Sequence, residues 1–155
     1  MTEISTPDLE NEIERVRREL DLIKLSGFNI IRLLLIWKAI EPKPNPNLEE
    51  LLPEGQEYLR KMSKIMDVLY ERGMYVFLDF HQDLAHDVYG GDGLPDWALA
   101  IDEKHPRLTP AGFKNKEWYL QYLTNESLKY TYESFWKNDL TNKDIGLEHF
   151  PVRTG

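Results

Sequence analysis

Residues 28–37, FNIIRLLLIW, decide the fold class, because nearly all of them are apolar and several are β-branched. A run of this kind is typical of a strand buried on both faces. A second run, MYVFLDF, occupies residues 74–80. The sequence therefore predicts two buried strands, at residues 28–37 and 74–80.

Amphipathic helices are predicted before each strand. From residue 9 to residue 23, apolar residues recur at alternating steps of four and three, which places them on one helical face, and Gly27 ends this helix. Residues 53–72 show the same periodicity and are followed by Gly73. A proline-rich connection, EPKPNPN at 41–47, separates the first strand from the second helix.

The order helix, strand, helix, strand predicts an α/β fold. Two buried parallel strands need both faces covered and both edges paired, so further strands are implied. A (β/α)8 barrel or an open doubly wound sheet would each supply them.

Composition excludes several classes of partner. A net charge of −8 argues against nucleic acid and against an anionic membrane surface. The absence of cysteine excludes disulfides and thiolate metal sites. The start of the chain lacks a signal peptide, and no run has the roughly 18 apolar residues of a membrane helix, so a cytoplasmic location is the default expectation.

The segment after the second strand, residues 81–113, is rich in Gly, Pro, Asp and His, and its length favours an active-site lid. A third helix is predicted from about Asn125, with Leu128, Tyr132 and Phe135 on one side. Trp118 and Trp136 are interpreted as ordinary packing residues.

Polar residues follow the predicted strands where parallel strands present a ligand site, at their carboxyl ends. His81, Gln82 and Asp83 are of the types that recognise sugar hydroxyls. Trp37, Trp97 and Tyr89 are of the type that packs against sugar rings. Within the strands, a buried Arg32 needs a partner. It is predicted either to form a structural ion pair with Asp79 or to orient a catalytic carboxylate.

The cluster His81, Asp83, His86 and Asp87 leaves open a metal-dependent hydrolase. No phosphate-binding loop or serine-nucleophile motif is present, and Gly90–Gly93 reads as a turn. We therefore expect no cofactor.

Three motifs resemble glycoside hydrolase family five, in its endoglycoceramidase-like and glucosylceramidase-like branch. They are GFNIIRLLLIWKAIEP at 27–42, LYERGMYVFLDFHQD at 69–83 and GGDGLPDWA at 90–98. The resemblance covers roughly residues 20 to 100. It implies a partial (β/α)8 TIM barrel: helix 1, strand 2, helix 2, strand 3, and the long loop and helix that follow.

The resemblance also implies roles for individual residues. Arg32 would support the region of the catalytic nucleophile, and His81 and Asp83 would line the sugar subsite nearest the cleaved bond. Trp37, Gln82 and Trp97 would complete the substrate site, for a carbohydrate or glycolipid. The mechanism of the family is retaining and uses two glutamates about 5 Å apart.

Neither glutamate of that mechanism is expected in this chain. The acid/base of the family lies in an Asn-Glu-Pro motif, whereas Asn125-Glu126-Ser127 opens a helix and lacks the proline. Residues 1–155 are thus predicted to be a single incomplete domain, the N-terminal part of a β-glycosidase catalytic domain, without turnover of its own. A non-catalytic carbohydrate-binding or self-associating remnant, joined through open strand edges, is the main alternative.

Overall fold

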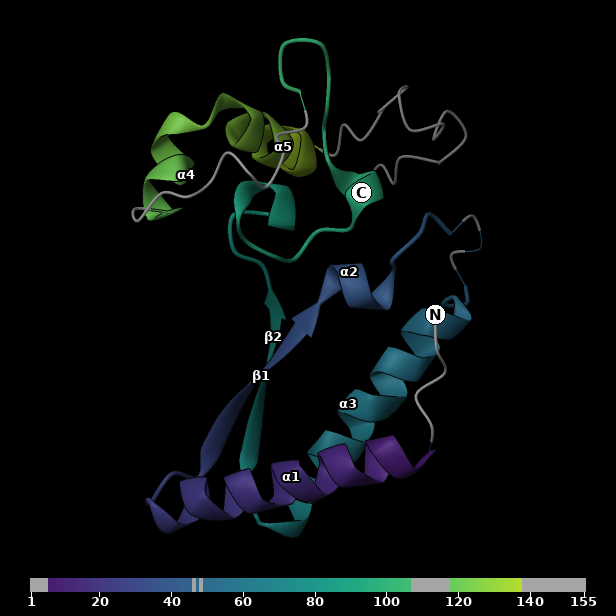
Figure 1. Cartoon of the computed structure of the whole chain (residues 1–155), viewed down its shortest axis with the longest axis vertical. Coiled ribbons are helices and arrows are strands. Elements are labelled where there is room, and N and C mark those ends of the chain that lie inside the picture. The colour runs from purple at the N-terminus through teal and green to yellow at the C-terminus, as the bar shows by residue number, and fades with distance from the viewer. Residues whose placement is uncertain (1–5, 46, 48, 107–117, 138–155) are drawn as a thin grey trace. The chain divides into compact units, whose positions relative to one another are not determined.

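The computed structural model describes residues 6–45, 47, 49–106 and 118–137 (Figure 1). Its regular elements are α1 (Thr6–Leu25), β1 (Ile30–Ile36), α2 (Trp37–Ile40), α3 (Pro53–Glu71), β2 (Tyr75–His81), α4 (Gln121–Thr124) and α5 (Glu126–Lys137). Short 3-10 turns lie at η1 (Asp87–Tyr89), η2 (Asp96–Ala98) and η4 (Trp118–Leu120). The predicted order of helix, strand, helix, strand is confirmed.

The chain divides into two compact units. The first unit comprises residues 1–34 and 56–79, and the second comprises residues 35–55 and 80–155. Across the described ranges, no helix is both long enough and apolar enough to cross a membrane.

The core of the first unit is formed by α1 and α3 together with one side of the strands. Leu20 from α1 and Val68 and Leu69 from α3 are buried, and Ile31 and Val76 of the strands pack against them. The glycines predicted to end both helices adopt left-handed backbone angles, with φ of 89° at Gly27 and 61° at Gly73. The periodicity of both helices therefore identified their buried faces correctly.

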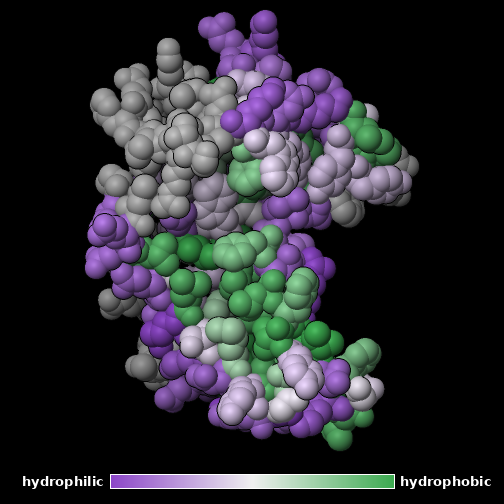
Figure 2. All heavy atoms as spheres, turned by 180° about the vertical axis from the view of Figure 1, so that it is seen from behind, coloured by the Kyte–Doolittle hydropathy of each residue, from purple (hydrophilic) through white to green (hydrophobic). Residues whose placement is uncertain are grey.

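β1 and β2 pair in parallel as a two-stranded sheet. The prediction that both strands are buried on both faces was wrong. Alternate residues face the helical core, whereas Ile30 is 56% exposed, Phe77 58% and Tyr75 70%. The physical reason is that α1 and α3 supply apolar partners on one side of the strands only. Figure 2 shows a broad apolar area on the surface of the molecule.

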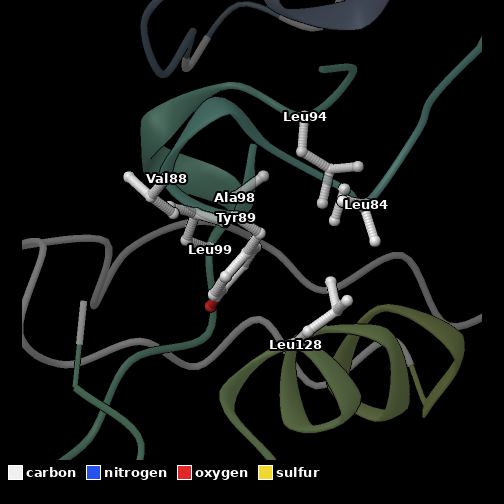
Figure 3. Close-up of a cluster of buried hydrophobic side chains, with 8 residues drawn as sticks. Leu84, Val88, Tyr89, Leu94, Ala98, Leu99 and Leu128 are labelled. Carbon is white, nitrogen blue, oxygen red and sulfur yellow. The ribbon is translucent and has the colours of Figure 1, made fainter. Parts of the chain in front are cut away.

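The segment that we expected to be an active-site lid has a core of its own over its described part. Leu84, Val88, Tyr89 and Leu99 are buried together with Leu128 of α5 (Figure 3). The expectation that Tyr89 packs against a sugar ring was wrong, because its ring is fully buried in this core. Its hydroxyl lies 3.2 Å from the Thr131 hydroxyl, so the polar end of the ring is also paired. The core holds the loop after β2 against α5 within the second unit.

The predicted helix near Asn125 is confirmed as α5. The Asn125 side chain accepts a hydrogen bond from the Leu128 backbone N–H at 3.1 Å, which is the expected N-cap interaction. The interpretation of Trp136 as a packing residue was wrong, because it is 80% exposed and makes an edge contact with Phe135. The side chain of Trp118 lies outside the described part.

Candidate functional site

The six predicted site residues are divided between the two units. Arg32 belongs to the first unit, and Trp37, His81, Gln82, Asp83 and Trp97 belong to the second.

Arg32 of β1 pairs with Asp79 of β2, and both residues belong to the first unit. Its Nε and one terminal nitrogen donate to Asp79 Oδ2 at 2.8 and 2.5 Å. This confirms the predicted ion pair. The expectation that Arg32 is buried was wrong, since its side chain is 57% exposed. A pair this open to solvent contributes little to stability, and the role toward a catalytic carboxylate stays a prediction.

The polar triplet His81, Gln82 and Asp83 begins at the last residue of β2. Asp83 forms an isolated antiparallel bridge with Asp92, through backbone hydrogen bonds of 3.0 and 2.7 Å. The predicted turn at Gly90–Gly93 is confirmed, because Gly90 has a left-handed backbone and returns the chain to this bridge. The glycine turn therefore holds the residues after β2 in place.

Two glycines of this turn allow the close approach. A Cβ atom at Gly91 would lie 1.7 Å from the carbonyl oxygen of Asp83. A Cβ atom at Gly93 would lie 2.4 Å from Cβ of Gln82, and Gly93 also has a φ of 123°. Sequence reasoning identified the turn but missed this packing, because nothing local in the sequence says what lies against a glycine.

Two tyrosines hold the side chains of the triplet, and sequence reasoning missed both as site residues. Tyr122 donates its hydroxyl proton to Asp83 Oδ1 at 2.7 Å. Tyr132 donates to Gln82 Oε1. Their rings stack with centroids 6.1 Å apart. Tyr132 was predicted to lie on the apolar side of its helix, but no sequence signal linked either hydroxyl to residues some 40 to 50 positions away.

The environment of both phenols favours their neutral forms. Burial is the largest cause that raises the pKa of Tyr122, and the neighbouring Asp83 carboxylate raises it further. Burial likewise raises the pKa of Tyr132 well above its ordinary value. Both hydroxyls are therefore protonated, and able to donate, throughout the neutral range.

The backbone directly after the triplet is strained. Leu84 and Ala85 have φ angles of 47° and 59°, a left-handed region that non-glycine residues rarely adopt. Leu84 N–H donates to the Tyr122 hydroxyl at 2.9 Å, and Ala85 N–H donates to Gln82 Oε1 at 3.1 Å. Strain of this kind persists only where surrounding contacts hold it, and it is concentrated at functional sites.

Trp37 and Trp97 form an aromatic corner in the second unit. Their rings meet edge to face with centroids 5.2 Å apart. Trp37 Nε1 donates to the Glu41 carboxylate at 2.6 Å, and Trp97 Nε1 donates to the Glu41 carbonyl oxygen at 2.8 Å. Glu41 was missed, although its position four residues after Trp37 on a helical turn was available in the sequence.

The four residues that left a metal site open do not come together as one. His86 is fully buried, with Nδ1 2.6 Å from Asp87 and Nε2 3.4 Å from Asp96. Lys38 Nζ lies 2.9 Å from Asp87, and Asp83 is engaged with Tyr122. Within the described ranges, no group of three or more His, Cys, Asp or Glu side chains could hold a metal ion.

The aromatic corner is linked to the polar triplet through the glycine turn. The backbone N–H of Lys38, next to Trp37, donates to the carbonyl oxygen of Gly93 at 2.8 Å, and Gly93 lies against Gln82. Carboxylate, amide and indole groups in one unit are of the types that can bind a polyhydroxylated ligand with apolar ring faces.

Comparison with known proteins identifies the family of the chain. The family model for cellulases, glycosyl hydrolase family 5, matches residues 2–142. Endoglycoceramidase I of Rhodococcus hoagii is 34% identical over 90 residues, which cover 58% of this chain and 16% of that protein. A glucosylceramidase of Aspergillus fumigatus is 33% identical over 91 residues, which cover 59% of this chain and 11% of that protein.

Solved structures share the fold. Endo-glycoceramidase II from Rhodococcus sp. superposes with a TM-score of 0.58 at 24% identity, over 94% of this chain and 28% of its own. Cryptococcus neoformans sterylglucosidase 1 gives a TM-score of 0.54 at 24% identity, over 74% of this chain and 18% of its own. At this identity the likeness establishes the fold alone, and it confirms the partial TIM barrel predicted from the sequence.

The chain thus spans a small part of the length of its relatives, and the match of the family model extends over most of its own residues. The chain belongs to glycosyl hydrolase family 5, the cellulase family.

Proposed function

We propose that these residues form a sugar-binding part of a retaining β-glycosidase that acts on a glycolipid or a related β-glucoside. The observation that carries this proposal is that tyrosine hydroxyls hold Gln82 and Asp83, in the same unit as the Trp37–Trp97 corner and joined to it through Gly93. In this proposal His81, Gln82 and Asp83 bind sugar hydroxyls, and the indole rings pack against the apolar face of a sugar.

The relatives support the choice of substrate class. Those with curated names include an endoglycoceramidase, glucosylceramidases and an ergosteryl-beta-glucosidase, and these names share a glycosidic bond to a lipid. Endo-glycoceramidase II has been solved as a complex with ganglioside GM3 and as a lactosyl-enzyme intermediate. A glycosyl-enzyme intermediate is the signature of a retaining mechanism.

We assign no catalytic residue within residues 1–155. A retaining glycosidase needs two carboxyl groups about 5 Å apart, one as nucleophile and one as acid/base. Two carboxylates that follow β2 are engaged by protein groups: Asp83 by Tyr122, and Asp87 by Lys38. In the proposal the two glutamates are supplied by sequence outside these residues, and 1–155 is the N-terminal part of the catalytic domain.

Arg32 would support the region of the nucleophile through its guanidinium group. It donates two hydrogen bonds to Asp79. A guanidinium carries a fixed positive charge and binds carboxylates in a defined geometry, which suits this role.

The test combines turnover with binding. We expect the 155-residue chain to bind methyl β-D-glucopyranoside weakly, measured by calorimetry, and to show no hydrolysis of 4-nitrophenyl β-D-glucopyranoside. Asp83→Ala should abolish binding, whereas Asp67→Ala, a carboxylate on α3, should leave it unchanged. Hydrolysis that Asp83→Ala abolishes would show that a catalytic pair lies within these residues. Equal binding of the glucoside by both variants would show that the triplet is not part of the sugar site.

The exposed strand face favours a second candidate, association between copies of this chain. Ile30, Phe77 and Tyr75 present a large apolar area at the protein surface. Sedimentation velocity at two concentrations tenfold apart tests it, with a concentration-dependent dimer as the expected result. A Phe77→Lys variant that dimerises as well as the parent would refute association through this face.

A further inference from the structure

Protein contacts hold the Gln82–Asp83 pair through one oxygen atom of each side chain. The Tyr122 hydroxyl donates to Asp83 Oδ1 and itself accepts from Leu84 N–H. Gln82 Oε1 accepts from the Tyr132 hydroxyl and from Ala85 N–H. In the described residues, each hydrogen bond between another residue and these two side chains is made to Oδ1 or Oε1. The opposite atoms, Gln82 Nε2 and Asp83 Oδ2, are the ones left for a ligand.

The orientation of the Gln82 amide follows from its partners. A backbone N–H can only donate, so the atom that accepts from Ala85 N–H at 3.1 Å must be the amide oxygen. The Tyr132 hydroxyl donates to the same oxygen. The NH2 group is therefore turned away from the two protein donors, and Gln82 can present a hydrogen-bond donor to a ligand.

The orientation of Asp83 follows in the same way from Tyr122. The Tyr122 hydroxyl oxygen accepts from Leu84 N–H at 2.9 Å, so that its single proton can point at Asp83 Oδ1, 2.7 Å away. One phenol thus holds both the carboxylate and the first residue of the strained turn. A hydrogen bond to a charged group is among the stronger ones in proteins.

Each tyrosine thus fixes one side chain of the pair and one residue of the turn. Tyr122 acts on Asp83 and Leu84 directly, and Tyr132 acts on Gln82, whose oxygen in turn accepts from Ala85. The two rings also stack on one another, with centroids 6.1 Å apart. Both rings are carried by the α4–α5 segment, far in sequence from the residues they hold.

We propose that Tyr122 and Tyr132 are positioning residues that fix the orientation of Gln82 and Asp83. The pair then binds sugar hydroxyls through one fixed donor, Gln82 Nε2, and one fixed acceptor, Asp83 Oδ2. The proposal rests on the assignment of this site to sugar binding. A hydroxyl group both accepts and donates, so a sugar with two hydroxyls in reach satisfies both atoms, whereas an analogue that lacks one of them leaves a polar group unpaired.

The first arm of the test concerns the positioning role and uses no ligand. In the unmodified chain, NMR should detect a scalar coupling across the hydrogen bond from the Ala85 amide nitrogen to the Gln82 side-chain carbonyl carbon. Tyr122→Phe should accelerate exchange of the Leu84 amide about 10-fold or more, and Tyr132→Phe should shift the Gln82 side-chain NH2 resonances. The matched control is Tyr70→Phe, because Tyr70 is 85% exposed on α3, and it should change neither signal.

The second arm measures affinity for methyl β-D-glucopyranoside. Tyr122→Phe should weaken binding about 10-fold, the size expected when a hydrogen bond to a charged group is lost. A Tyr122→Phe, Asp83→Asn double variant should bind no more weakly than Asp83→Asn alone, because the tyrosine acts through the carboxylate. Among monodeoxy glucosides, at least one should lose most of its affinity for the parent chain and little for Asp83→Asn.

The proposed function and the positioning role can be refuted independently of each other. If the parent chain does not bind the glucoside, the proposed function is refuted, while the coupling and the exchange rates still decide whether the tyrosines hold the pair. If binding is present but Tyr122→Phe keeps both full affinity and a protected Leu84 amide, the positioning role is refuted. If the Tyr122→Phe variant does not fold, as judged by circular dichroism, the test relies on the scalar coupling between Ala85 and Gln82 in the unmodified chain. Absence of that coupling would refute the fixed orientation of Gln82.

Discussion

Replacement of Gly91 by alanine should destabilise the second unit by a steric effect that has no conformational component. The added Cβ would lie 1.7 Å from the Asp83 carbonyl oxygen and 2.8 Å from Cβ of Leu84, and the nearest of these atoms is backbone. To relieve the overlap, the turn must move away from Asp83, and the hydrogen bond from Asp92 N–H to that oxygen, 2.7 Å long, is lost.

The magnitude follows from these two effects. Overpacking of a closely packed site costs about 1–3 kcal/mol, and loss of one internal hydrogen bond costs about 1 kcal/mol. We therefore expect Gly91→Ala to lower the free energy of unfolding by about 2–4 kcal/mol. Urea denaturation followed by circular dichroism measures this, with the second unit observed through the near-ultraviolet signal of its tryptophans.

The control is Gly90→Ala, one residue earlier. Gly90 has a φ of 86° but no atom within 4 Å of the position that a Cβ would take, so alanine there carries only the left-handed backbone cost of about 1–2 kcal/mol. The reasoning is refuted if Gly91→Ala is no more destabilising than Gly90→Ala. A loss in Gly91→Ala without any change of the Asp83 backbone amide resonance would also contradict it.

Three further predictions concern stability. Leu69→Ala, in the core of the first unit, should cost about 2–5 kcal/mol in urea denaturation, whereas Leu25→Ala, at an exposed position, should change little; equal effects would contradict the assigned core. Asn125→Ala should cost about 1 kcal/mol through loss of the α5 cap, and an unchanged midpoint would argue against the cap. Because burial raises the pKa of Tyr132, the neutral phenol is favoured in the folded state; stability is then retained below the ordinary tyrosine pKa of about 10 and decreases as pH rises above it. Tyr132→Phe should make this decrease shallower, and an identical pH dependence in both chains would refute it.

Periodicity and turn chemistry predicted most of the fold. The apolar steps of four and three located the buried faces of α1 and α3, and Gly27 and Gly73 located their ends. These signals are local: each depends on residues within a few positions of one another. The burial of the strands depends instead on what covers each face, and the prediction of two covered faces, read from the run at 28–37, was wrong on one of them.

The assignment of His81, Gln82 and Asp83 to a sugar site stays a prediction, and the residues that hold Gln82 and Asp83 were not predicted. The position of Gln82 and Asp83 after a strand indicated a ligand site, and the geometry around them is consistent with that reading. The contributions of Tyr122, Tyr132 and Gly91 arise from contacts between segments far apart in sequence. Such contacts leave no periodic or spacing signal, because any exposed tyrosine or loop glycine has the same local appearance.

The central claim, that the residues after β2 bind a sugar, is tested most directly by NMR mapping of the 15N-labelled chain during titration with methyl β-D-glucopyranoside. We predict saturable shifts at the Gln82 side-chain NH2 group, at the Asp83 amide and at the Trp97 indole N–H, all with one dissociation constant. The same titration of Asp83→Ala should leave these resonances unchanged. Shifts confined to other residues, or none at a concentration that saturates a millimolar site, would contradict the account.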